Sequence, residues 1–408
     1  MHTTDVNEGV EDAKEWLAKA FRRVRLTVIS KIEQNESIYR ELDASRAKVT
    51  LKEKDANPKS QAGADSRKTF TDHMVVVDWT ADRGWADPEI VPHAAFTLMP
   101  TASVLHYSTV CYEGMKLYRG FDGKLRLYRP DENAARLATS AERISLPAPP
   151  PAEFKALVKK LCSIDGPKWL PQSRQGEYLY IRPCIIGTDP SMGFDIPKEA
   201  RFFIVISGWE TVAETAPSGL RLLTSRADEI RAWPGGSGNF KVGPNYGPTL
   251  RNLGQTKGRG YDMTLWLFGP DSRITEALCY LEKYLELVTS PVGDGLILPG
   301  ITRQSVLTLA SERLREGAAT AYNLEPLEVV ERPLTMSDLA AAHDEGRLLA
   351  GLAVGTTYFV TPVGEIDWNG KQILLDSAEN KHLLAIKGWL SDIMYGKVES
   401  EWAEIVDE

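Results

Sequence analysis

Alternating apolar and polar positions mark a series of strands along the chain. The alternation begins at Met74–Asp78 and returns at Lys124–Tyr128, after the segment Gly120–Gly123, whose glycines are typical of a hairpin turn. The same pattern, or a short apolar run, predicts further strands at 178–186, 201–206, 220–224 and 263–268, followed by a strand that carries Glu276.

Helical spacing lies between these strands. In Asp131–Ile144, the residues Ala134, Leu137, Ala138 and Ala141 fall on one face of a helix. The pattern predicts other helices at 152–162, at 248–257 and at 303–314, the last beginning after Gly300-Ile-Thr302 and presenting Val306, Leu307, Leu309 and Ala310 to a sheet. Helices and strands therefore mix throughout, which indicates an α+β or α/β fold class.

A length of 408 residues suggests two domains. The polar stretch 52–68 buries little apolar area and indicates an arm, and the Thr-, Ala-, Pro- and Ser-containing stretch after residue 206 indicates a linker. We therefore expect a partly disordered N-terminal extension at 1–69, a smaller α/β domain at 70–206, a linker at 207–219 and a larger domain at 220–408.

Composition narrows the class of function. Hydrophobic residues at 43% and charged residues at 25% are typical of a soluble globular protein. The net charge of −8, without a basic block flanked by aromatics, disfavours nucleic acid as a partner. No apolar run approaches the roughly 20 residues that span a bilayer. The four cysteines contain no C-x-x-C, so neither a disulfide framework nor a metal site is expected.

The N-terminal segment leaves the compartment open. Residues 16–29 are amphipathic and basic, as in a mitochondrial import sequence, but acidic residues precede them and transit peptides are poor in acids. We therefore interpret the segment as a surface helix or an extension. A reducing, cytoplasmic compartment fits best, and the mitochondrion is the alternative.

Lys241 is the first candidate for chemistry. It lies in the glycine-containing run Ser237–Tyr246, and the acidic Glu276 follows in the next part of the chain. Enzymes that use pyridoxal phosphate (PLP) need a lysine amine that bonds to the cofactor aldehyde and a carboxylate that keeps the pyridine nitrogen protonated. The glycines let the backbone approach a flat ring closely. A lysine on a solvated glycine-rich loop is the alternative for this run taken alone.

Several runs, in order, carry a resemblance to a known family. They are Phe70–Met74, Leu105–Tyr107, Tyr112–Lys116, Arg126–Pro130, Tyr178–Pro183, Arg231–Trp233 with the lysine loop, Leu296–Arg303 and Ile393–Gly396. Between Phe70 and Gly396 the chain resembles the branched-chain amino acid aminotransferases, which are fold type IV PLP enzymes. The resemblance implies a two-domain fold with a smaller mixed N-terminal domain and a larger C-terminal domain rich in antiparallel sheet.

The resemblance also implies the residues that hold the cofactor. Lys241 would bond to PLP, Glu276 would contact the pyridine nitrogen and Tyr246 the phenolic oxygen. The phosphate would be bound by residues at the start of helices and in hydroxyl-rich turns together with one arginine, namely Ile301, Thr302, Thr356 and Arg136. Taken alone, Gly-Thr turns are common and Arg136 could lie on an exposed helix face.

Substrate contacts follow from the same resemblance. Tyr107, Tyr112, Tyr180 and Arg182 match positions around the substrate side chain and the distal carboxylate of a dicarboxylate partner, and the N–H groups of Thr356 and Thr357 match those that hold the α-carboxylate. The implied partners are an amino acid, a 2-oxo acid and a second copy of the chain in a homodimer.

The chain departs from the family after Glu276. A Gly-Thr-Met-Asn segment is replaced by residues 277–287, which are shorter than the family hairpin, and a Ser-Gly-Thr-Ala turn has become Val354-Gly-Thr-Thr357. Tyr358 and Thr361 stand where some animal members have a redox pair of cysteines. The function that we expect is transfer of the amino group from branched-chain or similar apolar L-amino acids to 2-oxoglutarate. The departures leave two alternatives, a related enzyme of a specialised biosynthetic pathway with a different amine donor, and a catalytically impaired paralogue.

Overall fold

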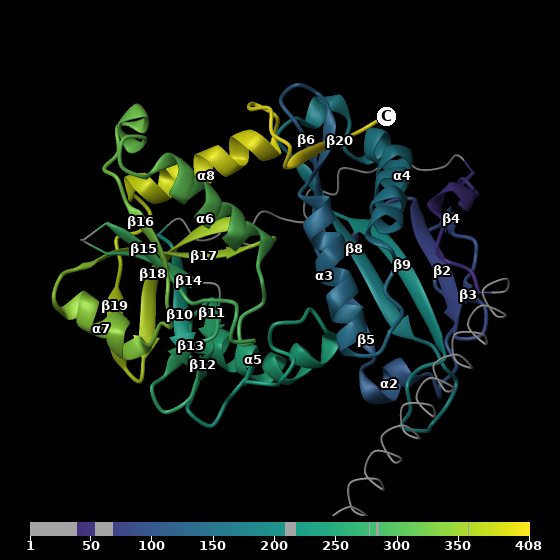
Figure 1. Ribbon diagram of the computed structural model, residues 1–408, viewed down its shortest axis with the longest axis horizontal. Coiled ribbons are helices and arrows are strands. Elements are labelled where there is room, and N and C mark those ends of the chain that lie inside the picture. The colour runs from purple at the N-terminus through teal and green to yellow at the C-terminus, as the bar shows by residue number, and fades with distance from the viewer. Residues whose placement is uncertain (1–38, 54–67, 209–217, 277, 283–284, 358) are drawn as a thin grey trace, which may run out of the picture.

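Two large sheets lie side by side, with helix α3 at the boundary between them (Figure 1). The structure is a computed structural model that describes residues 39–53, 68–208, 218–276, 278–282, 285–357 and 359–408. Its α-helices are α2 (Ser103–Tyr107), α3 (Pro130–Arg143), α4 (Pro151–Trp169), α5 (Leu250–Gly258), α6 (Ile301–Arg313), α7 (Met336–Asp344) and α8 (Lys381–Met394). Short 3-10 helices are η1 (Ala44–Arg46), η3 (Gln172–Arg174), η5 (Gly243–Asn245), η6 (Gly247–Thr249) and η7 (Ala319–Tyr322).

The first sheet has the strand order β1-β4-β2-β9-β8-β6-β7-β20, with β3 beside β2 and β5 beside β8. Its pairs are antiparallel except β1 with β4. The strands are β1 (Lys48–Val49), β2 (His73–Thr80), β3 (Gly84–Trp85), β4 (Glu89–Pro92), β5 (Val110–Tyr112), β6 (Met115–Arg119), β7 (Leu125–Tyr128), β8 (Tyr178–Gly187), β9 (Glu199–Ser207) and β20 (Ala403–Val406). Along each strand, alternate side chains point to the same face of the sheet. Those on one face, such as Leu117 of β6, Leu127 of β7 and Ile181 of β8, pack with α3 and α4 in one hydrophobic core.

The second sheet has the order β11-β10-β18-β17-β14-β15-β16, with β19 beside β18. Its strands are β10 (Leu220–Thr224), β11 (Met263–Leu265), β14 (Leu278–Glu282), β15 (Glu286–Thr289), β16 (Glu328–Glu331), β17 (Leu348–Gly355), β18 (Phe359–Trp368) and β19 (Lys371–Leu374), and β12 (Leu267–Phe268) pairs separately with β13 (Arg273–Ile274). Helices α6 and α8 pack on one core and α7 on another. The antiparallel pairing that dominates both sheets agrees with the expected fold class.

The C-terminal strand β20 connects the two halves of the molecule. After α8, which packs on the second sheet, the chain crosses to the first sheet, where β20 pairs with β7 (Figure 1). The side chain of Glu408 forms an ion pair with Arg119, which is fully buried and also donates to the carbonyl oxygen of Leu170 at 2.7 Å. A C-terminal segment thus belongs to the sheet that the N-terminal half builds.

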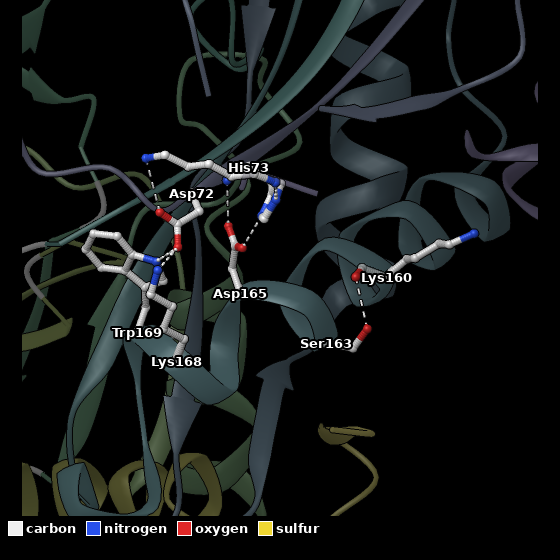
Figure 2. A network of polar contacts seen from close by, with 8 residues as sticks. Asp72, His73, Lys160, Ser163, Asp165, Lys168 and Trp169 are labelled. Carbon is white, nitrogen blue, oxygen red and sulfur yellow. Dashed lines mark hydrogen bonds and ion pairs between the residues drawn. The ribbon is translucent and has the colours of Figure 1, made fainter. Parts of the chain in front are cut away.

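Helix α4 anchors the N-terminal part of the first sheet through a polar network (Figure 2). The carboxylate of Asp165 accepts hydrogen bonds from the backbone N–H of His73 at 3.0 Å and from its Nδ1 at 2.6 Å. The backbone N–H of Lys52 donates to Nε2 of His73, so the ring proton lies on Nδ1. Asp72 accepts from Lys168 and from the indole of Trp169. Lys52 is therefore fixed to the sheet through His73, which α4 holds by buried hydrogen bonds.

Most of the expected elements are present, with three differences. Helix α4 runs on to Trp169, beyond the expected end at residue 162. The expected strand 263–268 is divided into β11 and β12. The expectation that Glu276 lies on a strand is wrong, because β13 ends at Ile274 and Glu276 occupies a bend before β14. Residues 16–29, most of the linker at 207–219 and Tyr358 lie outside the described residues, and the domain limits stay a prediction.

Within the described residues, no helix is long and apolar enough to cross a membrane, and no cluster of His, Cys, Asp or Glu could hold a metal ion. Cys111, Cys162 and Cys184 are buried free thiols. Burial raises the pKa of each of them, which keeps the thiol protonated and unreactive.

Candidate active site

The lysine loop is held rigidly between α3 and β5. The side-chain amide of Asn245 donates to the carbonyl oxygens of Ser237 at 2.7 Å and Phe240 at 2.8 Å, which closes the loop on itself. The backbone N–H of Lys241 donates to Oγ of Ser140 at 2.9 Å. Its carbonyl oxygen accepts from the backbone N–H of Tyr112 at 3.1 Å. With its backbone fixed on both sides, Lys241 extends its side chain into a cavity.

This cavity lies where the two sheets face each other and has a volume of about 210 Å³. Segments that are distant in the sequence line it, namely the residue before β6, α3, β8, the lysine loop, the bend at Glu276, the start of α6 and the end of β17 with the turn after it. The lining residues are Gly114, Arg136, Tyr180, Lys241, Glu276, Ile297, Leu298, Gly300, Ile301, Thr302, Val354, Gly355, Thr356 and Thr357. Lys241, Glu276, Arg136, Ile301, Thr302, Tyr180, Thr356 and Thr357 were all expected from the sequence, and the structure brings them together.

Helix α3 presents one face to the cavity. The helix begins with Pro130 at its first position, where a missing N–H is harmless, and Asn133, Arg136 and Ser140 follow at intervals that place them on one side. Arg136 is buried rather than exposed, with 9% of its surface accessible. The spacing explains why the arginine and the serine that holds the lysine loop point in the same direction.

Glu113 holds Arg136 in place. Its carboxylate accepts from Nε of Arg136 at 2.7 Å and from Nη2 at 2.9 Å, and it also accepts from Asn133 at 2.7 Å. Burial raises the pKa of the fully buried Glu113, but Arg136 and Lys241 outweigh this effect, and the pKa is lowered overall. Nη1 of Arg136 donates to the carbonyl oxygen of Pro299 at 2.9 Å. The remaining N–H groups of the guanidinium stay available for an anion.

The start of α6 supplies further donors. Gly300 precedes the helix, and no side chain caps its first turn, so the backbone N–H groups of Ile301 and Thr302 have no partner within the helix. Such a helix N-terminus favours a negatively charged group. Together with Arg136, it forms an anion cradle, which we define as Arg136, Ile301, Thr302 and Thr356.

Glu276 lies at another side of the cavity and is paired with Arg231. Nε of Arg231 is 2.9 Å from Oε1 of Glu276, and Nη2 of Arg231 donates to the carbonyl oxygen of Thr275 at 3.1 Å. Burial raises the pKa of Glu276, and Arg231 opposes this shift. The carboxylate therefore has a partner that favours its ionised form, while 34% of its side-chain surface stays exposed and the residue lines the cavity.

Aromatic residues surround the lysine amine. Nζ of Lys241 is 5.1 Å from the ring centroid of Tyr112 and 5.7 Å from that of Tyr246, and the two rings are 5.2 Å apart. The guanidinium of Arg182 lies over the Tyr112 ring at 4.6 Å and donates to the hydroxyl of Tyr180 at 3.1 Å. Burial and the neighbouring Tyr246 raise the pKa of Tyr112, so its hydroxyl stays protonated. Tyr112, Tyr246 and Arg182 thus form a wall around the amine, just outside the lining residues of the cavity.

Tyr107 is the one expected site residue that the structure places elsewhere. It ends α2, and its hydroxyl donates to the carbonyl oxygen of Met192 at 2.8 Å. The centroid of its ring is 5.4 Å from that of Phe194. Tyr107 does not line the cavity of its own chain. It lies instead on an exposed surface.

Four residues around the site were not predicted as functional residues, namely Glu113, Ser140, Arg231 and Asn245. Glu113 and Arg231 occur inside runs that carry the family resemblance, and Ser140 follows Arg136 at helical spacing. These signals could have identified them as candidates. Nothing in the local sequence shows, however, which buried carboxylate pairs with which arginine.

Comparisons with known proteins agree with this geometry. The sequence model of the amino-transferase class IV family matches residues 110–353. The cytosolic branched-chain-amino-acid aminotransferase of Saccharomyces cerevisiae is 38% identical over 90% of this chain and 98% of its own length. The cytosolic enzyme of Mus musculus is 39% identical over 82% of this chain and 86% of its own length.

Solved structures show the same fold. The branched-chain amino acid aminotransferase of Escherichia coli superposes with a TM-score of 0.63 at 22% identity, and covers 83% of this chain and 99% of its own. The enzyme of Thermobaculum terrenum in its PLP form gives a TM-score of 0.65 at 19% identity, with 84% of this chain and 100% of its own covered. The expected fold, two-domain fold type IV, is confirmed.

Proposed function

The chain belongs to the amino-transferase class IV family, and we propose that it is a PLP-dependent transaminase that transfers the amino group of branched-chain or similar apolar L-amino acids to 2-oxoglutarate. The observation that carries the proposal is the shared cavity. Lys241, Glu276 and the anion cradle line a single space of about 210 Å³ between the two sheets. The relatives that are named branched-chain-amino-acid aminotransferases support the choice of amino donor.

The residues of the cavity fit PLP. The free N–H groups of Arg136 and of the α6 N-terminus suit a phosphate. Glu276, held by Arg231, suits a protonated pyridine nitrogen, and Tyr246 suits the phenolic oxygen. When bound, PLP supplies an aldehyde that reacts with amines and a ring that accepts electrons from the substrate Cα.

The residues of this chain then have distinct tasks. Lys241 would hold the cofactor through Nζ, and once the substrate amine has taken its place the freed Nζ would act as general base and then general acid, removing the proton at the substrate Cα. Ser140 and Asn245 fix the loop so that this amine stays in reach. Glu276 would keep the pyridine nitrogen protonated through an ion pair.

Substrate binding is assigned to the turn and to the aromatic wall. The backbone N–H groups of Thr356 and Thr357 would bind the α-carboxylate, since both residues line the cavity. Arg182 would bind the distal carboxylate of 2-oxoglutarate, because its Nε is buried and has no hydrogen-bond partner within the described residues. Tyr112 and Tyr180 hold this guanidinium in position.

We also infer that the protein is a homodimer. The surface around Tyr107 exposes large apolar side chains, with Leu105 at 59%, Met192 at 59%, Phe194 at 89% and Ile196 at 67%. An exposed apolar patch of this kind is typical of an interface. A second copy that covers it would place Tyr107 near the site of its partner. Cytosolic and mitochondrial relatives are both known, and we assign this chain to the cytosol, with the mitochondrion as the alternative.

A spectral titration tests the proposed function. The purified protein should show the visible band of lysine-bound PLP, and adding leucine, isoleucine or valine should bleach the band, whereas 2-oxoglutarate should restore it. Lys241→Ala should lack the band and the activity, and it is the matched control. A protein that stays colourless with added PLP would favour the impaired paralogue. Bleaching by other donors alone would favour the specialised pathway.

A further inference from the structure

Lys116 is a buried lysine that the roles above leave without a function. It lies on β6 opposite Tyr180 of β8, on the face of the sheet that carries Gly114 and Tyr118, while the intervening Leu117 joins the hydrophobic core. Only 6% of its surface is exposed. Its ammonium lies 3.8 Å from the ring centroid of Tyr178, and within the described residues no carboxylate forms an ion pair with it. A buried ammonium without a counter-ion is unfavourable.

The side chain of Lys116 lines a second, smaller cavity. This cavity has a volume of about 20 Å³, enough for one water molecule. It adjoins the larger cavity, because a common set of residues lines both: Gly114, Ile301, Thr302, Gly355 and Thr356. Lys116 therefore lies beside Thr302 and Thr356 of the anion cradle.

The anion cradle has little uncompensated positive charge apart from Lys116. The charge of Arg136 is largely neutralised, because Glu113 binds two of its nitrogens at 2.7 and 2.9 Å. The N-terminus of α6 contributes the equivalent of roughly half a positive charge. Among the described residues of the smaller cavity, Lys116 is the one cationic side chain, and no carboxylate offsets it.

We propose that Lys116 is a second cation of the anion cradle, and that its ammonium stabilises an anionic group bound beside Thr302 and Thr356, directly or through the water that the smaller cavity can hold. The identity of this anion rests on the proposed function. It is the phosphate of the cofactor or the α-carboxylate of the substrate, which share the chemistry of a compact oxyanion. In the first case Lys116 helps to bind the cofactor, and in the second it helps to bind the substrate.

Burial gives the interaction a pH dependence. Burial alone lowers the pKa of Lys116 to about 7. A bound anion favours the charged form, so above this pH the protein must take up a proton when the anion binds, and affinity falls as the pH rises. Below it the ammonium is charged in both states, and affinity is independent of this group. The charged or titratable groups around it are Tyr118 on β6, Tyr128 on β7, Tyr178 and Tyr180 on β8, and the Glu113–Arg136 pair.

The test compares wild type with Lys116→Met, which keeps the length without the charge, and Lys116→Arg, which keeps the charge. The dissociation constants of the PLP-free protein for PLP and for pyridoxal, which lacks the phosphate, are measured at about pH 6 and about pH 8.5. Those of the PLP-loaded protein for leucine and for 3-methylbutylamine, which lacks the carboxylate, are measured in parallel. Inorganic phosphate is the third probe, read out as the rise in melting temperature that it produces in the PLP-free protein.

We expect Lys116→Met to weaken one anionic ligand about tenfold at the lower pH and its uncharged analogue hardly at all. A loss of affinity for PLP identifies the phosphate as the anion, and a loss of affinity for leucine identifies the α-carboxylate. Lys116→Arg should bind as wild type does at the lower pH and should keep that affinity at the higher pH, where wild type weakens. Equal effects on the anions and their analogues, or none on either, would overturn the proposal.

The inorganic phosphate probe separates this proposal from the proposed function. If wild type binds neither PLP nor leucine, the proposed function fails. A phosphate-induced rise in melting temperature that is smaller in Lys116→Met would then still support the second cation, and an equal rise would refute it. Folding of Lys116→Met is expected, because it removes an unpaired buried charge, and Lys116→Gln serves as a second uncharged variant.

Discussion

Replacing Arg231 should alter the pH dependence of the reaction more than the fold. Arg231 holds Oε1 of Glu276 at 2.9 Å, and in Arg231→Met this contact is lost while the apolar part of the side chain is retained. Burial already raises the pKa of Glu276, and Arg231 is the group that opposes the rise. Without it, the carboxyl group becomes easier to protonate, and under the proposed function it would then no longer face the pyridine nitrogen as an anion.

The magnitude follows from the exposure of the pair. A hydrogen bond to a charged group contributes about 1.5 to 3 kcal/mol. Because 34% of the side-chain surface of Glu276 is open, we take the lower end of this range, about 1.5 kcal/mol. Since 1.36 kcal/mol corresponds to a factor of ten, protonation of Glu276 becomes about tenfold easier in the variant, and its pKa rises further.

The assay is the pH profile of kcat/KM for leucine with 2-oxoglutarate. The acidic limb of the profile should move about one unit to higher pH in Arg231→Met, since protonation of Glu276 then begins at higher pH. Arg231→Lys retains the charge and should move the limb by less than half as much. Thermal melting monitors the fold, because Arg231 also donates to the carbonyl oxygen of Thr275. An unchanged acidic limb in Arg231→Met, or equal shifts in both variants, would refute the assigned role of this pair.

Three other predictions follow from the same contacts. Arg182→Met should raise the KM for 2-oxoglutarate about a hundredfold and leave the KM for leucine within about threefold, because one charge-assisted carboxylate contact is lost; steady-state kinetics with both substrates checks this, and equal changes in the two constants contradict it. Asp165→Asn should lower the free energy of unfolding by about 2 kcal/mol, since the new amide cannot accept both hydrogen bonds of His73; urea denaturation measures it, with the exposed Asp131→Asn as the control that should change by less than about 0.5 kcal/mol. Glu113→Gln should cost about 3 kcal/mol of stability because Arg136 keeps a buried charge without its partner, and the same denaturation experiment would contradict the pairing if the variant unfolds like wild type.

The elements that could be predicted from the sequence are those determined by local patterns. Helix α3 agrees with its expected span because Ala134, Leu137 and Ala141 give a clear helical period and are all buried. The turn before α6 and the hairpin between β6 and β7 carry their own glycine signals. The end of α4 was misjudged because Gly166 and Pro167 argue against a helix locally, whereas packing on the first core continues it.

Contacts between distant segments could not be predicted in this way. The pairing of β20 with β7 joins segments that are more than 270 residues apart, and no local pattern of apolar residues indicates which sheet accepts β20. The bend at Glu276 also depends on strand pairing, because β13 ends where its pairing with β12 ends. The sequence predicts that these segments exist but not where they dock.

The candidate site shows the same limit in its electrostatics. The resemblance predicted a cationic Arg136 beside a phosphate, but the structure gives this arginine a buried carboxylate at 2.7 Å, so its field is nearly that of a dipole. Lys116, in contrast, has no carboxylate partner among the described residues, so its ammonium is not offset by an ion pair when it is protonated. Which charges cancel depends on contacts across strands β5, β6 and helix α3, which a sequence leaves unspecified. A cradle for an anion is therefore recognised by the charges that remain after pairing, and not by the number of basic residues around it.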